Sequence, residues 1–193
     1  MKLIRLFSSD KYKGEKNYIN NQRLYEIART VLLFALAAAV YLIGFLTTHT
    51  NKNLLTIVAV LGVLPAAKSA VNMIMFLRFK SCDRELAAEF EEVSEGLCAC
   101  FDRVFTSYEK NYVVDHLFVS GKTLIGYTSK KSFPESDFEK HIGSYLKAEG
   151  YKDMTIKVFE DKDKYLERLS SFKGIEAGER EAGIMNVLLS ISL

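Results

Sequence analysis

Two long apolar runs dominate the first half of the chain. Residues 30–48 contain no charged side chain. After a short polar turn at 49–53, a second apolar run covers residues 54–77 and is interrupted only by Pro65 and Lys68. An α-helix rises about 1.5 Å per residue, so about 20 apolar residues cross a hydrocarbon core about 30 Å thick. The pattern therefore predicts an integral membrane protein with a transmembrane hairpin at 30–79, whose spans cover about 30–48 and 54–77.

The distribution of basic residues predicts how this hairpin is oriented. Seven lysines and arginines precede the first span, only Lys52 lies between the spans, and Arg78, Lys80 and Arg84 follow the second. Because positive charge stays on the cytoplasmic side, both termini are expected in the cytosol, with the protein in the plasma (inner) membrane as a multi-pass protein. Residues 1–29 then form a cytosolic N-terminal segment. Its first nine residues favour either an interfacial helix or a frayed end, and the sequence leaves both open.

The second span carries three candidate functional residues, Pro65, Lys68 and Asn72. Proline removes a backbone donor, which predicts a kink. Lys68 lies inside the span, where a charge is costly and usually functional. Two interpretations are open: the lysine extends to the cytosolic interface, or it lines a pore or a water-filled cavity near Asn72.

A regular amphipathic pattern follows the hairpin, and it predicts a stem helix within residues 80–110. Apolar residues alternate spacings of four and three, as on one face of a helix. This seam serves either an oligomer, as in a coiled coil, or the core of the next domain. The seam residues are Leu86, Phe90, Val93, Leu97 and Val104.

Residues 111–193 are predicted to form a small cytosolic α/β domain. Strands at 112–119 and 123–128 flank a Ser120-Gly121 turn, a helix covers about 135–149, and a third strand covers 154–159. A short helix follows Asp161, and a last helix begins near Glu179. The fold class is therefore an α+β membrane protein: a hairpin, an amphipathic helix and an α/β domain, in the order α-β-β-α-β-α-α after the hairpin.

Composition and residue spacing limit the kinds of binding site and partner that the sequence predicts. A net charge of +2 does not favour nucleic acid as the main partner, and three cysteines without a CxxC pair do not form a zinc or disulfide framework. His49, His116 and His141 lie in separate elements, so no metal and no cofactor is predicted. Ser120-Gly121-Lys122-Thr123 lacks the first glycine of a phosphate loop, because position 116 is a histidine.

A second pattern concerns Asp115 and the stretch Thr128-Ser129-Lys130. An acid on one strand and an acid-x-Lys at the end of the next resembles the layout of restriction-endonuclease-like domains, over about 60 residues. Thr128 stands where that layout needs a second acid to hold Mg²⁺. The resemblance implies a non-catalytic domain with this fold. Asp115, His116, Lys122 and Lys130 are the ligand-binding candidates, and no catalytic residue is assigned.

These observations favour a non-enzymatic membrane effector or sensor. Its cytosolic domain would bind a ligand or partner and couple to oligomeric transmembrane helices, which form a pore in one version of this hypothesis. The expected partners are the lipid bilayer, further copies of the chain, and a cytosolic protein or small molecule. Two alternatives are open: a membrane-anchored scaffold or adaptor that positions a partner, and a membrane-tethered metal-dependent hydrolase.

Overall fold

The computed structural model describes residues 12–175 and 177–193, which fall into two compact units. One unit is a helical hairpin, Ile19–Lys80, and the other is an α/β domain made of Tyr12–Tyr18 and Ser81–Leu193. The interfacial helix predicted for residues 1–9 lies outside the described residues. Each unit is described by itself below.

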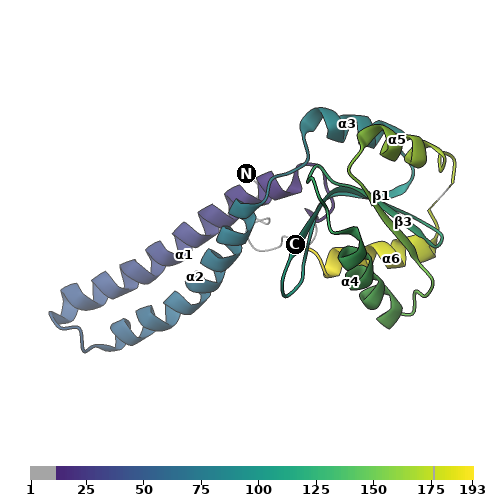
Figure 1. Cartoon of the computed structure of the whole chain (residues 1–193). Coiled ribbons are helices and arrows are strands. Elements are labelled where there is room, and N and C mark those ends of the chain that lie inside the picture. Colours follow the sequence, from purple (N-terminus) through teal and green to yellow (C-terminus); the bar gives the residue numbers. More distant parts are fainter. Residues whose placement is uncertain (1–11, 176) are drawn as a thin grey trace. The chain divides into compact units, whose positions relative to one another are not determined.

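The hairpin consists of α1 (Tyr18–Thr48) and α2 (Leu54–Arg78), which run side by side along their length (Figure 1). Asn53 caps α2, because its side-chain oxygen accepts a hydrogen bond from the backbone N–H of Thr56 at 2.8 Å. Both helices are long and apolar enough to cross a membrane. In the apolar window of each, only 17% of the residues are buried, so most of the apolar surface is left for another environment. The two predicted spans are confirmed as helices.

Small side chains form the seam between α1 and α2. The buried positions recur at heptad-like spacing, as in antiparallel packed helices. A Cβ atom added at Gly44 would lie 2.7 Å from the Cβ of Leu55, whereas one added at Gly62 would lie 3.7 Å from the Cβ of Ala37. Glycine at position 44 therefore leaves room for the side chain of Leu55, which a larger residue would contact too closely. The buried seam positions are Ala37 and Gly44 on α1 and Ala59, Ala66, Ser69 and Phe76 on α2.

The seam ends in a polar network. The hydroxyls of Thr30 and Ser69 lie 2.9 Å apart, and both residues are buried. The Arg29 guanidinium donates to the Ser69 hydroxyl at 3.2 Å and to the Glu26 carboxylate at 2.6 Å. These bonds satisfy polar groups that the helix contact removes from solvent.

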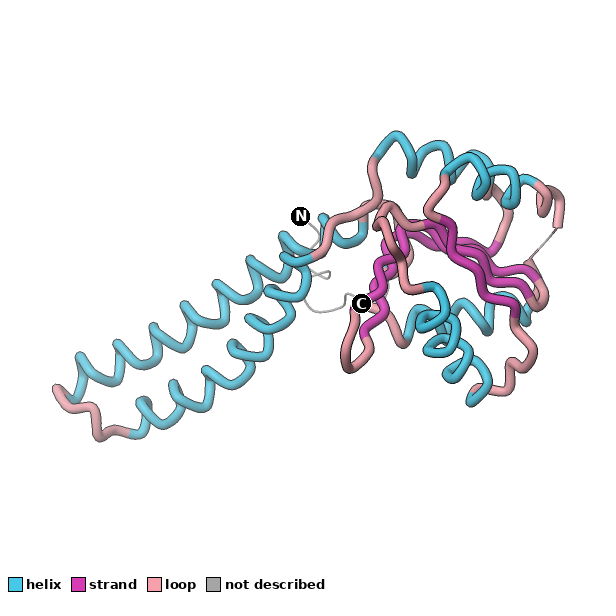
Figure 2. Tube along the Cα trace, viewed as in Figure 1, coloured by secondary structure: helices cyan, strands magenta, loops and turns pink. Residues whose placement is uncertain are grey.

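The second unit contains one mixed four-stranded sheet in the order β1-β2-β3-β4 (Figure 2). The strands are β1 (Cys98–Thr106), β2 (Asn111–Ser120), β3 (Thr123–Tyr127) and β4 (Thr155–Phe159). The first three strands are antiparallel neighbours, and β4 runs parallel to β3. A parallel pair needs a crossover, which α4 (Glu135–Ala148) supplies.

Helices cover both faces of this sheet (Figure 1). On one face, α3 (Arg84–Val93) and α5 (Lys162–Ser170) bury a largely aromatic core that includes Phe90 and Tyr165. On the other, α4 and α6 (Glu179–Ser190) bury a core of aliphatic and aromatic side chains that includes Phe138 and Leu188. The domain is therefore a three-layer arrangement with two separate cores.

The structure differs from the sequence prediction in the stem. The helix ends at Val93 instead of continuing toward residue 108, and Cys98–Thr106 is strand β1. Gly96 has a φ of 79°, a conformation that glycine adopts without strain and that a continuing helix does not allow. The order after the hairpin is therefore α-β-β-β-α-β-α-α, with one more strand than predicted.

The other predicted elements of the domain are confirmed. The two strands around Ser120-Gly121 are β2 and β3, the third predicted strand is β4, and the three helices that follow are α4, α5 and α6. Asp161 caps α5 by accepting hydrogen bonds from the backbone N–H groups of Asp163 and Lys164. The segment from Thr123 is a strand. A phosphate loop is followed by a helix, so this agrees with the interpretation that Ser120–Thr123 is not a phosphate loop.

Candidate functional site

Two aspartates meet across β1 and β2. The pairs Phe101–His116 and Arg103–Val114 flank the position at which Asp102 stands opposite Asp115. Asp102 is 2% exposed and has a φ of 56°, and Asp115 is 3% exposed. Like charges directly opposite each other on neighbouring strands are unfavourable, so this pair must be stabilised by other groups.

The regular alternation of β2 also breaks at this point. Val114 and Leu117 both belong to the core beneath α4 and α6, yet two residues, Asp115 and His116, lie between them instead of one. In an undistorted strand, adjacent side chains point to opposite faces. Asp115 and His116 therefore depart from the alternation that adjacent strand residues ordinarily show.

The connector between α2 and α3 is attached to this site. The backbone N–H of Cys82 donates to Oδ1 of Asp102 at 2.8 Å in a buried hydrogen bond. The next residue, Asp83, caps α3 by accepting from the N–H of Glu85 at 2.9 Å. A hydrogen bond to an ionised acceptor is stronger than a neutral one. Cys82 is therefore held at a defined position on β1.

Asp115 occupies an unusual electrostatic environment. Burial raises the pKa of its carboxyl, and the negative charge of Asp102 raises it further. Hydrogen bonds from Ser129, including one from its backbone N–H at 2.6 Å, and the positive charge of Lys130 act in the opposite direction. The carboxyl therefore holds its proton more readily than an exposed aspartate does.

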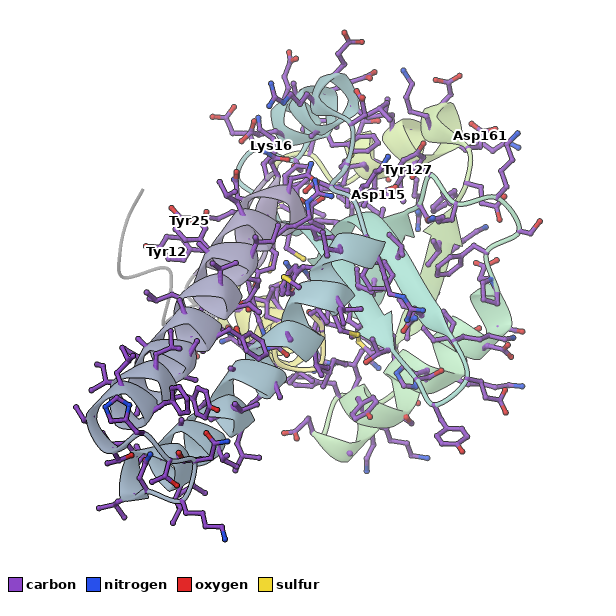
Figure 3. The ribbon with its side chains drawn as sticks, turned by 90° about the vertical axis from the view of Figure 1, so that its left-hand side faces the viewer. Tyr12, Lys16, Tyr25, Asp115, Tyr127 and Asp161 are labelled. Atoms are coloured by element: carbon purple, nitrogen blue, oxygen red, sulfur yellow. The ribbon has the colours of Figure 1, made fainter. Side chains whose placement is uncertain are left out.

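Cys82 and Tyr127 complete the surroundings of Asp115. Figure 3 shows Asp115 and Tyr127 close together on the α3 and α5 side of the sheet. Burial, with the charges of Asp115 and Asp102, raises the pKa of the Cys82 thiol to about 12. Burial and then Asp115 also raise the pKa of Tyr127. Because the reactive form of cysteine is the thiolate, Cys82 is not a nucleophile at neutral pH.

His116 lies in the aromatic core next to this site. Its Nδ1 and the Tyr165 hydroxyl lie 2.6 Å apart, and its ring stacks on that of Phe90 at a centroid distance of 5.4 Å. Burial lowers the pKa of His116 to about 3, so the imidazole is neutral. Among the described residues, its Nε2 has no hydrogen-bond partner. The histidine packs as an aromatic side chain and does not reach solvent.

Of the four ligand-binding candidates, the structure brings Asp115 and Lys130 together. The positive charge of Lys130 acts on the Asp115 carboxyl, as its effect on the pKa shows. Lys122 lies at the other end of β3, where it is exposed and forms a 3.9 Å ion pair with Asp153. It therefore belongs to a different part of the surface.

The three membrane candidates share one side of α2. Pro65, Lys68 and Asn72 are spaced by three and four residues, which places them on one helix face. Pro65 and Lys68 are exposed, whereas Ala66 and Ser69 form the seam with α1. Within the hairpin, Lys68 therefore points away from the partner helix.

The predicted seam residues of the stem are distributed over two elements. Leu86, Phe90 and Val93 lie on α3, Leu97 follows it, and Val104 lies on β1. Phe90 and Val104 are fully buried within the domain of one chain. They contribute to its core.

Chemically, the site lacks the groups that metal-dependent hydrolysis needs. Thr128, where the nuclease layout has its second acid, is fully buried, and its hydroxyl donates to the backbone carbonyl of Val113 at 2.7 Å. In residues 12–175 and 177–193, no three His, Cys, Asp or Glu side chains are grouped so that they could hold a metal ion. The arrangement is instead suited to holding a connector on a buried carboxylate pair.

Comparison with protein-family models, with curated proteins and with solved structures finds no match for this chain. The class of protein is therefore described by its architecture alone, which is a hairpin of two apolar helices joined to a small domain with a mixed four-stranded sheet.

Sequence reasoning missed Asp102 and Cys82. Position 102 fell within the predicted stem helix at 80–110, so the pairing of Asp102 with Asp115 could not be foreseen. The stretch CACFDRVFT, with aromatic and β-branched residues after Gly96, is the signal that could have identified β1.

Proposed function

We propose that the protein is a non-enzymatic integral membrane effector or sensor. Its cytosolic α/β domain binds a ligand or partner and passes that event to oligomeric transmembrane helices through the connector after α2. The observation that carries this proposal is the buried hydrogen bond from the Cys82 N–H to Asp102, which stands opposite the buried Asp115.

The connector is short and fixed at both ends. Phe79 ends α2 in an extended conformation, and Asp83 begins α3. Ligand binding or protonation that alters the Asp102–Asp115 pair changes the acceptor that holds Cys82. With so little chain between Cys82 and Arg78, a displacement of Cys82 acts on the last turn of α2. We place both ends of the chain on the cytosolic side of the plasma (inner) membrane, because the basic residues that flank the two spans are in excess on that side.

Lys68 supports the oligomeric part of the proposal. It points away from α1, so a lysine inside the membrane must either extend to the interface or meet another subunit. In an oligomer, the face with Pro65, Lys68 and Asn72 contacts a neighbour or a central pore. Ion flux into liposomes that contain the full chain tests the pore version. A flux that Lys68→Ala changes supports it, and no flux, or a flux that the variant leaves unchanged, removes it.

Hydrogen–deuterium exchange of the full chain in nanodiscs tests the coupling. Asp102→Ala removes the acceptor for the Cys82 N–H and is expected to raise amide exchange of residues 79–83 and the last turn of α2 at least about tenfold. Asp102→Asn keeps an acceptor and tolerates the positive φ, so exchange should stay near the wild-type rate.

Asp137→Ala is the matched control, because this exposed carboxylate pairs with Lys110 far from the connector. Exchange in the connector that is the same in Asp102→Ala, Asp137→Ala and the wild type would contradict the coupling.

A further inference from the structure

Two grooves lie at opposite edges of the α/β domain. One, of about 510 Å³, lies between β4 and α5, and the other, of about 520 Å³, lies between α3 and β1. The strand order makes β1 and β4 the two edge strands. Because α3 and α5 cover the same face of the sheet, the two grooves lie on the same side of the sheet, one at each edge strand.

The groove at β4 is basic. Three basic side chains line it against one carboxylate, and the Lys157 ammonium lies 5.1 Å from the centroid of the Phe159 ring. The Arg168 guanidinium lies 5.0 Å from the ring centroid of Phe172. Aromatic rings hold these cations at fixed positions on the surface. The lining residues of this basic groove are Lys157, Phe159, Lys164, Glu167, Arg168 and Ser171.

The groove at β1 is acidic. It is lined by three glutamates of α3 and the turn after it, and its lining contains no basic side chain. Glu91 forms an ion pair with Lys16, and Glu92 and Glu95 are exposed. The lining residues of this acidic groove are Ala88, Glu91, Glu92, Ser94, Glu95, Leu97, Ala99 and Phe101.

We infer that the basic groove of one copy docks on the acidic groove of the next copy. The two grooves have opposite charge, and complementary charge selects partner and register at interfaces. Because the two patches differ and lie at opposite edges, the contact is head-to-tail and repeats from copy to copy. In a membrane, where all copies share one orientation, such a contact closes into a ring when the rotation allows it.

The contact between the basic and the acidic groove is formed by side chains and not by backbone pairing of the edge strands. The N–H of Val158 on β4 donates to the Glu135 carboxylate at 3.3 Å, and the N–H of Phe101 on β1 donates to the carbonyl of Gly14 at 2.9 Å. These bonds occupy edge groups that a neighbouring strand would need. The contact therefore depends on charge and is sensitive to salt.

The inference rests on the proposed function in one respect, since both require several copies in one membrane. It is tested with the full chain in detergent by measuring molar mass against protein concentration at low and high salt. Lys164→Glu with Arg168→Glu reverses the basic groove, and Glu92→Lys with Glu95→Lys reverses the acidic groove. Each double variant is expected to raise the dissociation constant at least about tenfold at low salt. The fourfold variant, with both grooves reversed, should restore association.

A matched control is Lys140→Glu with Lys147→Glu, which changes the same number of exposed charges on α4, on the other face of the sheet. It should leave association unchanged. Association that is equally weakened by the control, or is not restored in the fourfold variant, overturns the inference. Oligomers that no charge variant changes overturn it and leave the proposed function intact, whereas a monomer under all conditions contradicts both.

Cysteine cross-linking tests the head-to-tail geometry separately. Ser171→Cys lies in the basic groove and Ala88→Cys in the acidic groove, and both positions are exposed. A chain with both substitutions should form a ladder of disulfide-linked multimers, and a mixture of the two single variants should form dimers only. Dimers formed by either single variant alone, above those of the unsubstituted chain, would indicate a symmetric contact and contradict the inference.

Discussion

The hairpin and the α/β domain bury their residues in different ways. Along the seam of the hairpin, small residues such as Ala37 and Gly44 are buried, while large apolar side chains point outward, among them Leu36 with 62% of its surface exposed. In the domain, Phe90 and Tyr165 are fully buried. The domain gains its stability from apolar area removed from water, whereas the hairpin leaves most of its apolar area exposed and buries small side chains between its helices.

The largest expected effect comes from removing a side chain of the domain core. Phe90→Ala deletes a ring that contacts His116, Tyr127 and Tyr165, and it should lower the free energy of unfolding by about 3–5 kcal/mol. The chain contains ten tyrosines and no tryptophan, so near-UV circular dichroism in detergent reports the loss of tertiary packing.

Leu36→Ala is the matched control for Phe90→Ala. It removes a large apolar side chain that the hairpin exposes, and it should leave unfolding of the domain unchanged. Equal losses in the two variants would show that the two units do not differ in how they bury apolar surface.

A second effect is the pH dependence that His116 gives to the domain. The unfolded chain takes up this proton below a pH of about 6.5, whereas the lowered pKa of about 3 keeps the folded form neutral. The free energy of unfolding should therefore fall as pH decreases from 6.5 toward 3, by about 1.4 kcal/mol per pH unit from this residue.

Denaturant titrations between pH 7 and 4.5 measure this dependence, and His116→Phe should lose that share of the slope. His141→Gln, which changes a histidine on α4, should keep it. Identical slopes in the wild type and His116→Phe would rule out His116 as the source.

A smaller effect distinguishes the packing of the hairpin. Gly44→Ala places a methyl group 2.7 Å from the Cβ of Leu55 and should destabilise the contact between α1 and α2 by about 1–3 kcal/mol. Gly62→Ala, whose methyl group would lie 3.7 Å from Ala37, should be tolerated. Amide exchange in the first turns of α2 measures both, and similar exchange in the two variants would argue against a close-packed seam.

The same difference between the units explains what the sequence could reveal. Freedom from charge over 19 residues identifies a long apolar helix directly, because the signal is local. The β-branched and aromatic content of β2 and the alternation in β4 are equally local signals. The helical spacing of apolar residues continues by coincidence through Gly96 and into β1, so the periodicity alone predicted a stem helix that is too long. The residues with this spacing are Leu86, Phe90, Val93, Leu97 and Val104.

The candidate site could be anticipated only in part. Asp115 and Lys130 were found because their order along the predicted strands resembles the layout of restriction-endonuclease-like domains. Asp102 and Cys82 join them through the pairing of β1 with β2 and the path of the connector, which depend on tertiary structure. Each groove is lined by one short stretch, residues 157–171 or 88–101, but its shape depends on how a helix packs against an edge strand, which the sequence pattern does not give.

The central claim is that the hairpin lies in a lipid bilayer and the α/β domain lies in water. Extraction of cell membranes with alkaline carbonate, which removes peripheral proteins, tests this claim most directly. The account predicts that the full chain stays in the membrane pellet and is released only by detergent. Recovery of the full chain in the supernatant would contradict it.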